Sequence, residues 1–313
     1  MEGSAVKRDE YPSGRKLALY FAMVFAVSWT CWWIAGSLRG PHFALDLSWF
    51  IAQIGVFAPS MVAVFFCLVS RRKTSFRRTA VTGSIYLVLI ATGAIVMTGA
   101  PADLESVPAW LRIVIVAMAS AVFSWFLFQR RVLLASRRDV RSGFRTILVL
   151  ISAWLFYPVV FSSAWLIVTS MTGERYVSMM SGRPDQAMFA ILTMVAFDFL
   201  FGGAAGEEPG WRGYALPALL GRLSPLSASL ALGLIWTLWH IPIDLTSGFG
   251  VRGIGGIALR LVTVCPMSII VTWFYVRFRT GIATSLLLHA GINIIPPLGF
   301  SNYEPAFGIL IIV

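Results

Sequence analysis

The stretch SPLSASLALGLIWTLWHIPI, residues 224–243, contains no Asp, Glu, Lys or Arg. A helix of about 20 apolar residues is long enough to cross the hydrocarbon core of a bilayer. Apolar stretches of similar length recur along the chain, at Leu17–Leu38, Leu47–Ser70, Thr79–Gly99, Ala109–Phe128, Ile147–Ser170, Ala187–Gly206, Ile254–Val276 and Ile282–Leu298. The sequence therefore predicts an all-α fold, a polytopic transmembrane helical bundle with about nine spans.

The composition excludes a soluble domain. Hydrophobic residues make up 58% of the 313-residue chain, charged residues 12%, and the mean hydropathy is +0.80. A soluble domain usually carries about 25% charged residues. The chain is therefore expected to be an integral membrane protein whose surroundings are the lipid bilayer.

The basic residues predict the orientation of the chain. The net charge is +11, and 19 of the 25 basic residues fall on the side of the membrane that holds the N-terminus, against five on the other side. Lys and Arg concentrate on the cytoplasmic side of membrane proteins. We therefore expect a cytoplasmic N-terminus, in a bacterial plasma membrane, and an inner-leaflet role for the charge rather than nucleic-acid binding.

Ionisable residues divide the chain into regions. Up to Ser170 the predicted spans hold almost none, whereas from Asp198 onward several enter the apolar runs. A carboxylate near the centre of a span costs about 2.5–3.5 kcal/mol on insertion scales, so such residues usually mark function. The prediction is an N-terminal region at 1–175 of unassigned role, a functional core at 187–298 and a tail at 299–313.

Spacing predicts which of these polar side chains meet. Glu207 and His240 lie at equal distances along the chain from a turn between Leu223 and Ser224. Two antiparallel helices would then place the carboxylate and the imidazole at the same depth, facing one another. His289 and Asn293 are spaced i,i+4 and share one face of the last predicted span.

Three further expectations concern the same region. Pro209–Gly210 is the predicted break in the helix that carries Glu207, because proline removes a backbone donor. Glu208 and Arg212 are spaced i,i+4 and predict an ion pair. Asp198 either lines a watery vestibule or supports helix packing, and Asp244 either orients His240 or marks the outer end of its span.

Three motifs in this region resemble those of the CPBP family of CAAX proteases and bacteriocin-processing enzymes. GEEPGWRGY at 206–214 resembles the family motif EExxxR, WTLWH at 236–240 resembles its aromatic-xxx-His motif, and HAGIN at 289–293 resembles HxxxN. The motifs occur in the family's order, within about Met188–Ile295, roughly a third of the chain.

The resemblance implies an intramembrane endopeptidase that cleaves a membrane-associated peptide or protein. It implies that Glu207 and His240 activate a water, that His289 and Asn293 stabilise the oxyanion, and that Glu208, Arg212 and Trp236 support them. The family's mechanism is glutamate-dependent, so no cofactor is favoured. If a metal is used, zinc bound by Glu207, His240 and His289 is the alternative.

Two other functions stay open on the sequence. A catalytically idle member would act as a membrane scaffold or bacteriocin-immunity factor. A proton-coupled transporter would also place buried Glu and His in spans, because such residues serve proton relays. The complete motif set favours the enzyme over the first alternative, and the absence of a repeat in the sequence argues weakly against the second.

Overall fold

The computed structural model describes residues 12–38, 47–69, 144–172, 198, 202–246, 254–278 and 280–293. The elements within these ranges are all helices: α1 (Gly14–Leu38), α2 (Leu47–Val69), α5 (Phe144–Thr172), α7 (Gly203–Gly210), the π-helical η4 (Trp211–Ala215), α8 (Leu216–Leu220), α9 (Pro225–Trp239), α10 (Ile241–Thr246), α11 (Ile254–Phe278) and α12 (Ala283–Asn293). The prediction of an all-α fold is confirmed. The predicted spans at 79–99 and 109–128, and the predicted tail at 299–313, lie outside the described residues.

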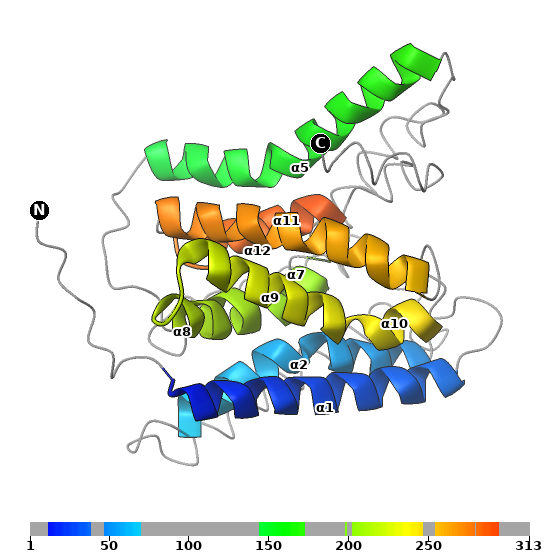
Figure 1. Ribbon diagram of the computed structural model, residues 1–313, viewed down its shortest axis with the longest axis vertical. Helices are drawn as coiled ribbons and strands as arrows, with labels where there is room; N and C mark the ends of the chain where they lie inside the picture. Colours follow the sequence, from blue (N-terminus) through cyan, green and yellow to red (C-terminus); the bar gives the residue numbers. More distant parts are fainter. Residues whose placement is uncertain are drawn as a thin grey trace, which may run out of the picture.

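The long helices lie side by side in one bundle (Figure 1). α1 packs on α2, α9 packs on α11, and α5 packs on α12. The short helix α7 lies between α2 and α12 and contacts both of them. The predicted N-terminal region is thus packed directly against the segment that carries the motifs, and α7 occupies the interior of the bundle.

The outer faces of the helices are apolar. Leu226, Leu230, Leu234 and Leu238 form an exposed stripe with i,i+4 spacing on α9, whereas Leu232, on the opposite side, is fully buried. Three described helices are long and apolar enough to cross a membrane, Gly14–Leu38, Arg145–Ala164 and Ile254–Phe278. Contiguous exposed apolar surface of this extent requires lipid around it. The chain is an integral membrane protein.

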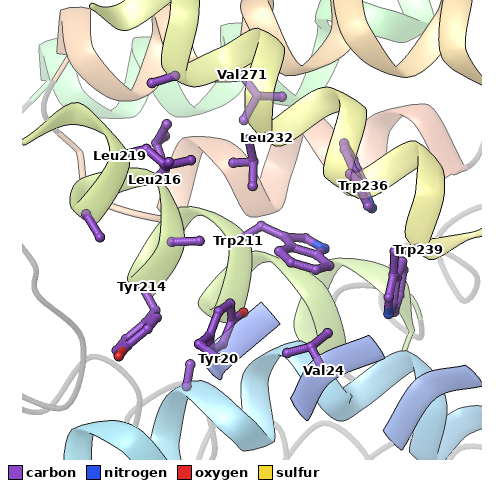
Figure 2. Packing of buried hydrophobic residues seen from close by; sticks show 14 of the residues in the cluster. Tyr20, Val24, Trp211, Tyr214, Leu216, Leu219, Leu232, Trp236, Trp239 and Val271 are labelled. Atoms are coloured by element: carbon purple, nitrogen blue, oxygen red, sulfur yellow. The ribbon is translucent and has the colours of Figure 1, made fainter. Parts of the chain in front are cut away.

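An aromatic cluster at the centre of the bundle fixes the helix that follows α7. The Trp211 ring stacks on Phe21, with centroids 6.3 Å apart, and meets Trp239 edge-on at 5.5 Å. Figure 2 shows Trp211 between Tyr20 of α1 and Trp239 of α9. Buried aromatic pairs of this kind add specific geometry to the apolar contact. The position of η4 is therefore determined by α1 and α9 together.

The predicted break at Pro209–Gly210 does not occur in the form we expected. The chain stays helical from Gly203 to Leu220, and a π-helical turn begins at Trp211, two residues after Pro209. Proline has no N–H to donate to the carbonyl four residues earlier, which here belongs to Ala205. The Ser60 hydroxyl of α2 donates to that carbonyl at 3.1 Å. The helix can continue because a neighbouring helix supplies the missing donor.

The same arrangement recurs within α2. Pro59 leaves the carbonyl of Gly55 without its helical donor, and the Ser28 hydroxyl of α1 donates to it at 2.8 Å. Close approach of α2 to α7 depends on glycine: a Cβ on Gly206 would lie 2.8 Å from the Val56 carbonyl. Serine hydroxyls bonded to backbone carbonyls thus join α1 to α2 and α2 to α7. These contacts fix the position within the bundle of the residues that follow Gly206.

Candidate active site

Glu207 lies on α7 with its carboxylate inside the bundle. Its Oε2 atom accepts hydrogen bonds from two indole groups, from Trp236 Nε1 at 2.5 Å and from Trp211 Nε1 at 3.3 Å. The side chain is buried, with Glu207 only 5% exposed. Both indole bonds use the same oxygen, so Oε1 is left to face the space beside α12.

Glu208, the next residue, has a different set of partners. Its Oε1 atom accepts from Arg212 Nη1 at 2.7 Å and from His289 Nδ1 at 2.7 Å. Glu208 and Arg212 are fully buried, and His289 is 3% exposed. The predicted i,i+4 ion pair is therefore present. Its carboxylate also orients the imidazole of His289 on α12, a helix far away in the sequence. The Arg212 guanidinium lies over the Trp236 ring, 4.4 Å from its centroid.

Three polar atoms converge beside Gly203. A Cβ built on Gly203 would lie 3.0 Å from His289 Nε2, 3.1 Å from Glu207 Oε1 and 3.2 Å from Asn293 Nδ2. These atoms come from α7 and α12, which contact one another. The glycine therefore leaves a small space open in which an acceptor and two nitrogen groups face the same point.

His240 occupies the turn that ends α9. Its backbone N–H bonds to the Thr237 carbonyl, and its Nδ1 donates to the freed Trp236 carbonyl at 2.8 Å. A carbonyl only accepts, so in the neutral ring Nε2 is the atom with the lone pair. The ring packs against Trp236 and Trp239, with centroids 6.0 and 4.7 Å away.

We expected the Glu207 carboxylate to face the His240 imidazole, but in the structure it bonds to the indole of Trp236. The carboxylate contacts Trp236, one turn before His240 on the same helix. Two physical reasons account for the offset. A π-helical turn holds more residues than an α-helical turn, so the arm after Glu207 is shorter than its residue count suggests. The indole of Trp236 is also long enough to reach across the gap first.

Polar atoms inside the cluster keep capacity for further hydrogen bonds. Within the described part of the chain, Glu208 Oε2, Arg212 Nε, Arg212 Nη2 and the Tyr157 hydroxyl are buried without a hydrogen-bond partner. Buried groups of this kind are rare and are typical of sites that take up water or a ligand. Tyr157 belongs to α5, so the N-terminal region lines this part of the interior.

Asp244 pairs away from the cluster. Both of its carboxylate oxygens accept from Arg260 of α11, Oδ2 from Nε at 2.6 Å and Oδ1 from Nη2. Its backbone N–H donates to the His240 carbonyl at 3.1 Å. This ion pair ties α10 to α11 just beyond the turn that carries His240. The ion pair therefore anchors that turn, whereas the His240 ring bonds to the Trp236 carbonyl.

The arrangement gives no support for the zinc alternative. Zinc needs three or four converging ligands, and among the residues that the structure describes no three His, Cys, Asp or Glu side chains are grouped in this way. Nδ1 of His240 bonds to the Trp236 carbonyl and Nδ1 of His289 to Glu208, so Nε2 is the atom of each ring that could bind a metal. The chemistry proposed below therefore contains no step through a metal.

Sequence reasoning missed several residues of the site. Ser60 of α2 bonds to α7, Trp211 at an unspecified position of EExxxR bonds to Glu207, and Gly203 provides the open space. Pro209 four residues after Ala205 signals a carbonyl that needs a donor, but nothing in the sequence says which helix supplies it. The spacing of Gly203 one turn before Glu207 is the signal that could have identified it.

Comparisons with known proteins show what the segment that carries this cluster is similar to. Residues 186–295 match the family model described as "Type II CAAX prenyl endopeptidase Rce1-like". A curated relative, CAAX prenyl protease 2 of Methanococcus maripaludis, is 33% identical over 96 residues. Residues 186–295, which include this cluster, are thus similar to the type II CAAX prenyl endopeptidases over about a third of the chain. The prediction from the three motifs is thereby confirmed.

The match covers only part of each protein. The alignment covers 29% of this chain and 35% of the relative, so the chain spans about a third of the length of the curated relative that it matches. All the predicted site residues lie inside the matched segment at 186–295, whereas Ser60, Tyr157 and the helices α1, α2 and α5 lie outside it. The domain boundaries at 175, 187 and 298 stay predictions.

Proposed function

We propose that this chain is an intramembrane endopeptidase that hydrolyses peptide bonds of membrane-associated peptides or proteins. The observation that carries the proposal is the convergence of Glu207 Oε1, His289 Nε2 and Asn293 Nδ2 on one point beside Gly203. Peptide hydrolysis needs a base for water and donors for the oxyanion. The matched segment and its protease relative support the same activity.

In the proposed reaction Glu207 activates the water. Its Oε2 atom is held by two indole donors, so Oε1 has a fixed direction toward the space beside Gly203. Oε1 accepts a proton from water, and the water oxygen bonds to the scissile carbonyl carbon. When the C–N bond breaks, Glu207 returns that proton to the leaving amine. The second water proton stays on the attacking oxygen, so the products are one new carboxylic acid, which then releases that proton to solvent, and one new amine; the enzyme is unchanged.

His289 and Asn293 are the proposed oxyanion donors. Nδ1 of His289 donates to Glu208, so Nε2 carries a hydrogen when the ring is protonated. The carboxylates of Glu207, Glu208 and Asp198 outnumber the one guanidinium of Arg212, so a protonated His289 offsets part of the negative charge; uncompensated buried charge is costly. Asn293 Nδ2 supplies a second donor, and preorganised donors of this kind often contribute more to catalysis than any other single effect.

His240 has a supporting role in this proposal. Its Nδ1 is bonded to the Trp236 carbonyl, so Nε2 of the neutral ring can accept a hydrogen bond. We assign it the second contact to the attacking water or to the substrate N–H. Glu208, Arg212 and Trp236 hold His289 and Glu207 in place through the contacts described above.

The proposed substrate reaches the site from the cytoplasmic side or through the lipid. The balance of 19 basic residues against five supports a cytoplasmic N-terminus. Apolar exposed faces on α9 and α11 favour a substrate that is itself bound to the membrane. A bacterial plasma membrane stays the expected location.

The proposal is tested by cleavage of a peptide library with the purified protein in lipid vesicles. Wild type, Glu207→Ala and His289→Ala are compared, each with and without a chelator. We expect cleavage by wild type in both conditions and its loss in both variants. Loss of wild-type cleavage on chelation would support zinc. Absence of cleavage in all three, with binding of a membrane partner intact, would support a scaffold or immunity factor instead.

A further inference from the structure

Asp198 stands at the start of the site, and the reaction proposed above does not use it. Its Oδ1 atom accepts from Asn293 Nδ2 at 2.9 Å and from the Gly203 backbone N–H at 3.0 Å. Its backbone carbonyl accepts from the Gly202 N–H at 3.1 Å. One carboxylate oxygen therefore joins the end of α12 to the beginning of α7.

The contact determines where the Asn293 amide points. A carboxamide nitrogen carries two hydrogens. Asp198 takes one of them, and the nitrogen itself lies 3.2 Å from the point beside Gly203 on which Glu207 and His289 converge. Without this acceptor the amide could rotate about its last torsion, which is broad for Asn. Asn293 is exposed and lies at the end of the described part of α12.

We propose that Asp198 is a positioning residue that holds the Asn293 amide in the direction required of an oxyanion donor. The inference rests on the proposed function, because it assigns Asp198 a role in that same reaction. The juxtaposition also fixes Gly203, since the same oxygen holds the backbone N–H of that residue. Asp198 thus sets two sides of the small space in which the water and the scissile carbonyl would meet.

A purely structural role makes a different prediction. If Asp198 only begins α7, its removal would lower stability and would act alike whatever residue stands at 293. If it acts through Asn293, its removal would lower kcat with little change in KM, and most of that effect would be seen only while the Asn293 amide is present. A double-mutant cycle separates these two roles.

The experiment measures kcat, KM and thermal stability in vesicles for wild type, Asp198→Ala, Asn293→Ala and the double variant. Asp198→Asn keeps an oxygen acceptor and serves as the conservative variant. Ser268→Ala is the matched control, because it removes a buried hydrogen bond to the Ser229 carbonyl outside the site. We expect Asp198→Ala to lower kcat about 10- to 100-fold, the range for partners that orient a functional group.

The expected pattern has three further parts. Asp198→Asn keeps kcat within about threefold of wild type, because its amide oxygen can replace Oδ1. Asp198→Ala lowers kcat much less in the Asn293→Ala background than in the wild-type background, because only its contact to the Gly203 N–H is then lost, and Ser268→Ala leaves kcat unchanged. Additive effects of the two substitutions, or a wild-type kcat in Asp198→Ala, would overturn the inference while leaving the proposed function intact. A wild type without hydrolysis would overturn both.

If Asp198→Ala does not fold, the conservative variant still decides. A kcat in folded Asp198→Asn that falls as far as in Asn293→Ala would contradict the proposed acceptor role, and a kcat near wild type would support it.

Discussion

The Ser60 hydroxyl on α2 donates to the Ala205 carbonyl, the group that Pro209 leaves without its helical partner. This contact lets α7 continue into the π-helical turn and carries Glu207 into the interior. A buried carbonyl without a donor costs about 1–3 kcal/mol. The relationship therefore connects a proline in the EExxxR motif to a serine outside the matched segment at 186–295.

Ser60→Ala should lower the free energy of unfolding in detergent by about 1–3 kcal/mol, because it leaves the Ala205 carbonyl unpaired. Pro209→Ala restores a backbone N–H that can donate to the same carbonyl. In the double variant we therefore expect the Ser60→Ala penalty to disappear. The control is Ser152→Ala, whose hydroxyl is exposed and bonds within its own helix. An equal Ser60→Ala penalty in both backgrounds would refute the compensation.

Gly203→Ala should abolish most of the activity without unfolding the protein. The added methyl would lie 3.0–3.2 Å from three polar atoms of the site and would fill the space proposed for the water. Alanine is otherwise the better helix former, by about 1 kcal/mol. We expect kcat to fall at least about tenfold, with each tenfold equal to about 1.4 kcal/mol. Melting temperature and kcat are measured together.

The matched control is Gly14→Ala, at the start of α1, where an added Cβ meets nothing within 4 Å. It should leave both quantities unchanged. A Gly203→Ala variant with wild-type kcat would show that the space beside Gly203 takes no part in the reaction.

The two indole groups that hold Glu207 should contribute unequally. Trp236→Phe removes the shorter bond, at 2.5 Å, and Trp211→Phe the longer one, at 3.3 Å. Hydrogen bonds to charged groups contribute about 1.5–3 kcal/mol, so we expect kcat per folded molecule to fall about 10- to 100-fold in Trp236→Phe. The decrease in Trp211→Phe should be smaller. The reverse order would contradict the geometry of the carboxylate.

The buried pair of Glu208 and Arg212 should be coupled in stability. Breaking one partner of a buried pair costs about 3–5 kcal/mol, because the other charge is left without compensation. Glu208→Gln and Arg212→Met should each show this loss in chemical denaturation, and the double variant should lose less than the sum. Arg15→Met, at an exposed position of α1, serves as the control. Additive losses would mean that the pair is not coupled.

Much of the fold could be predicted from the sequence, because apolar runs of membrane length have few other solutions. The observed α1, α2, α5 and α11 agree with the predicted spans to within a few residues. The helix through Pro209 could not be predicted, since its continuity depends on the Ser60 hydroxyl of another helix. Propensity alone favours a break at that proline.

Motif and spacing identified the candidate site residues, but they did not predict which side chains bond to one another. Equal spacing from the turn suggested that Glu207 faces His240, whereas the carboxylate bonds to Trp236 and the neighbouring Glu208 bonds to His289. Which oxygen faces which helix depends on side-chain length and on the π-helical turn, and neither is encoded in residue counts. The roles of Glu207, His240, His289 and Asn293 stay predictions.

The most direct test of the account follows the oxygen atom of the water. Wild type and Glu207→Gln, each purified and placed in lipid vesicles, are incubated with a cleavable membrane peptide in ¹⁸O-labelled water. The masses of the products are then measured by mass spectrometry. The account predicts one ¹⁸O in the new carboxyl group with wild type, and a rate at least about 100-fold lower with Glu207→Gln, as for loss of a general base. Cleavage by Glu207→Gln at the wild-type rate would contradict it.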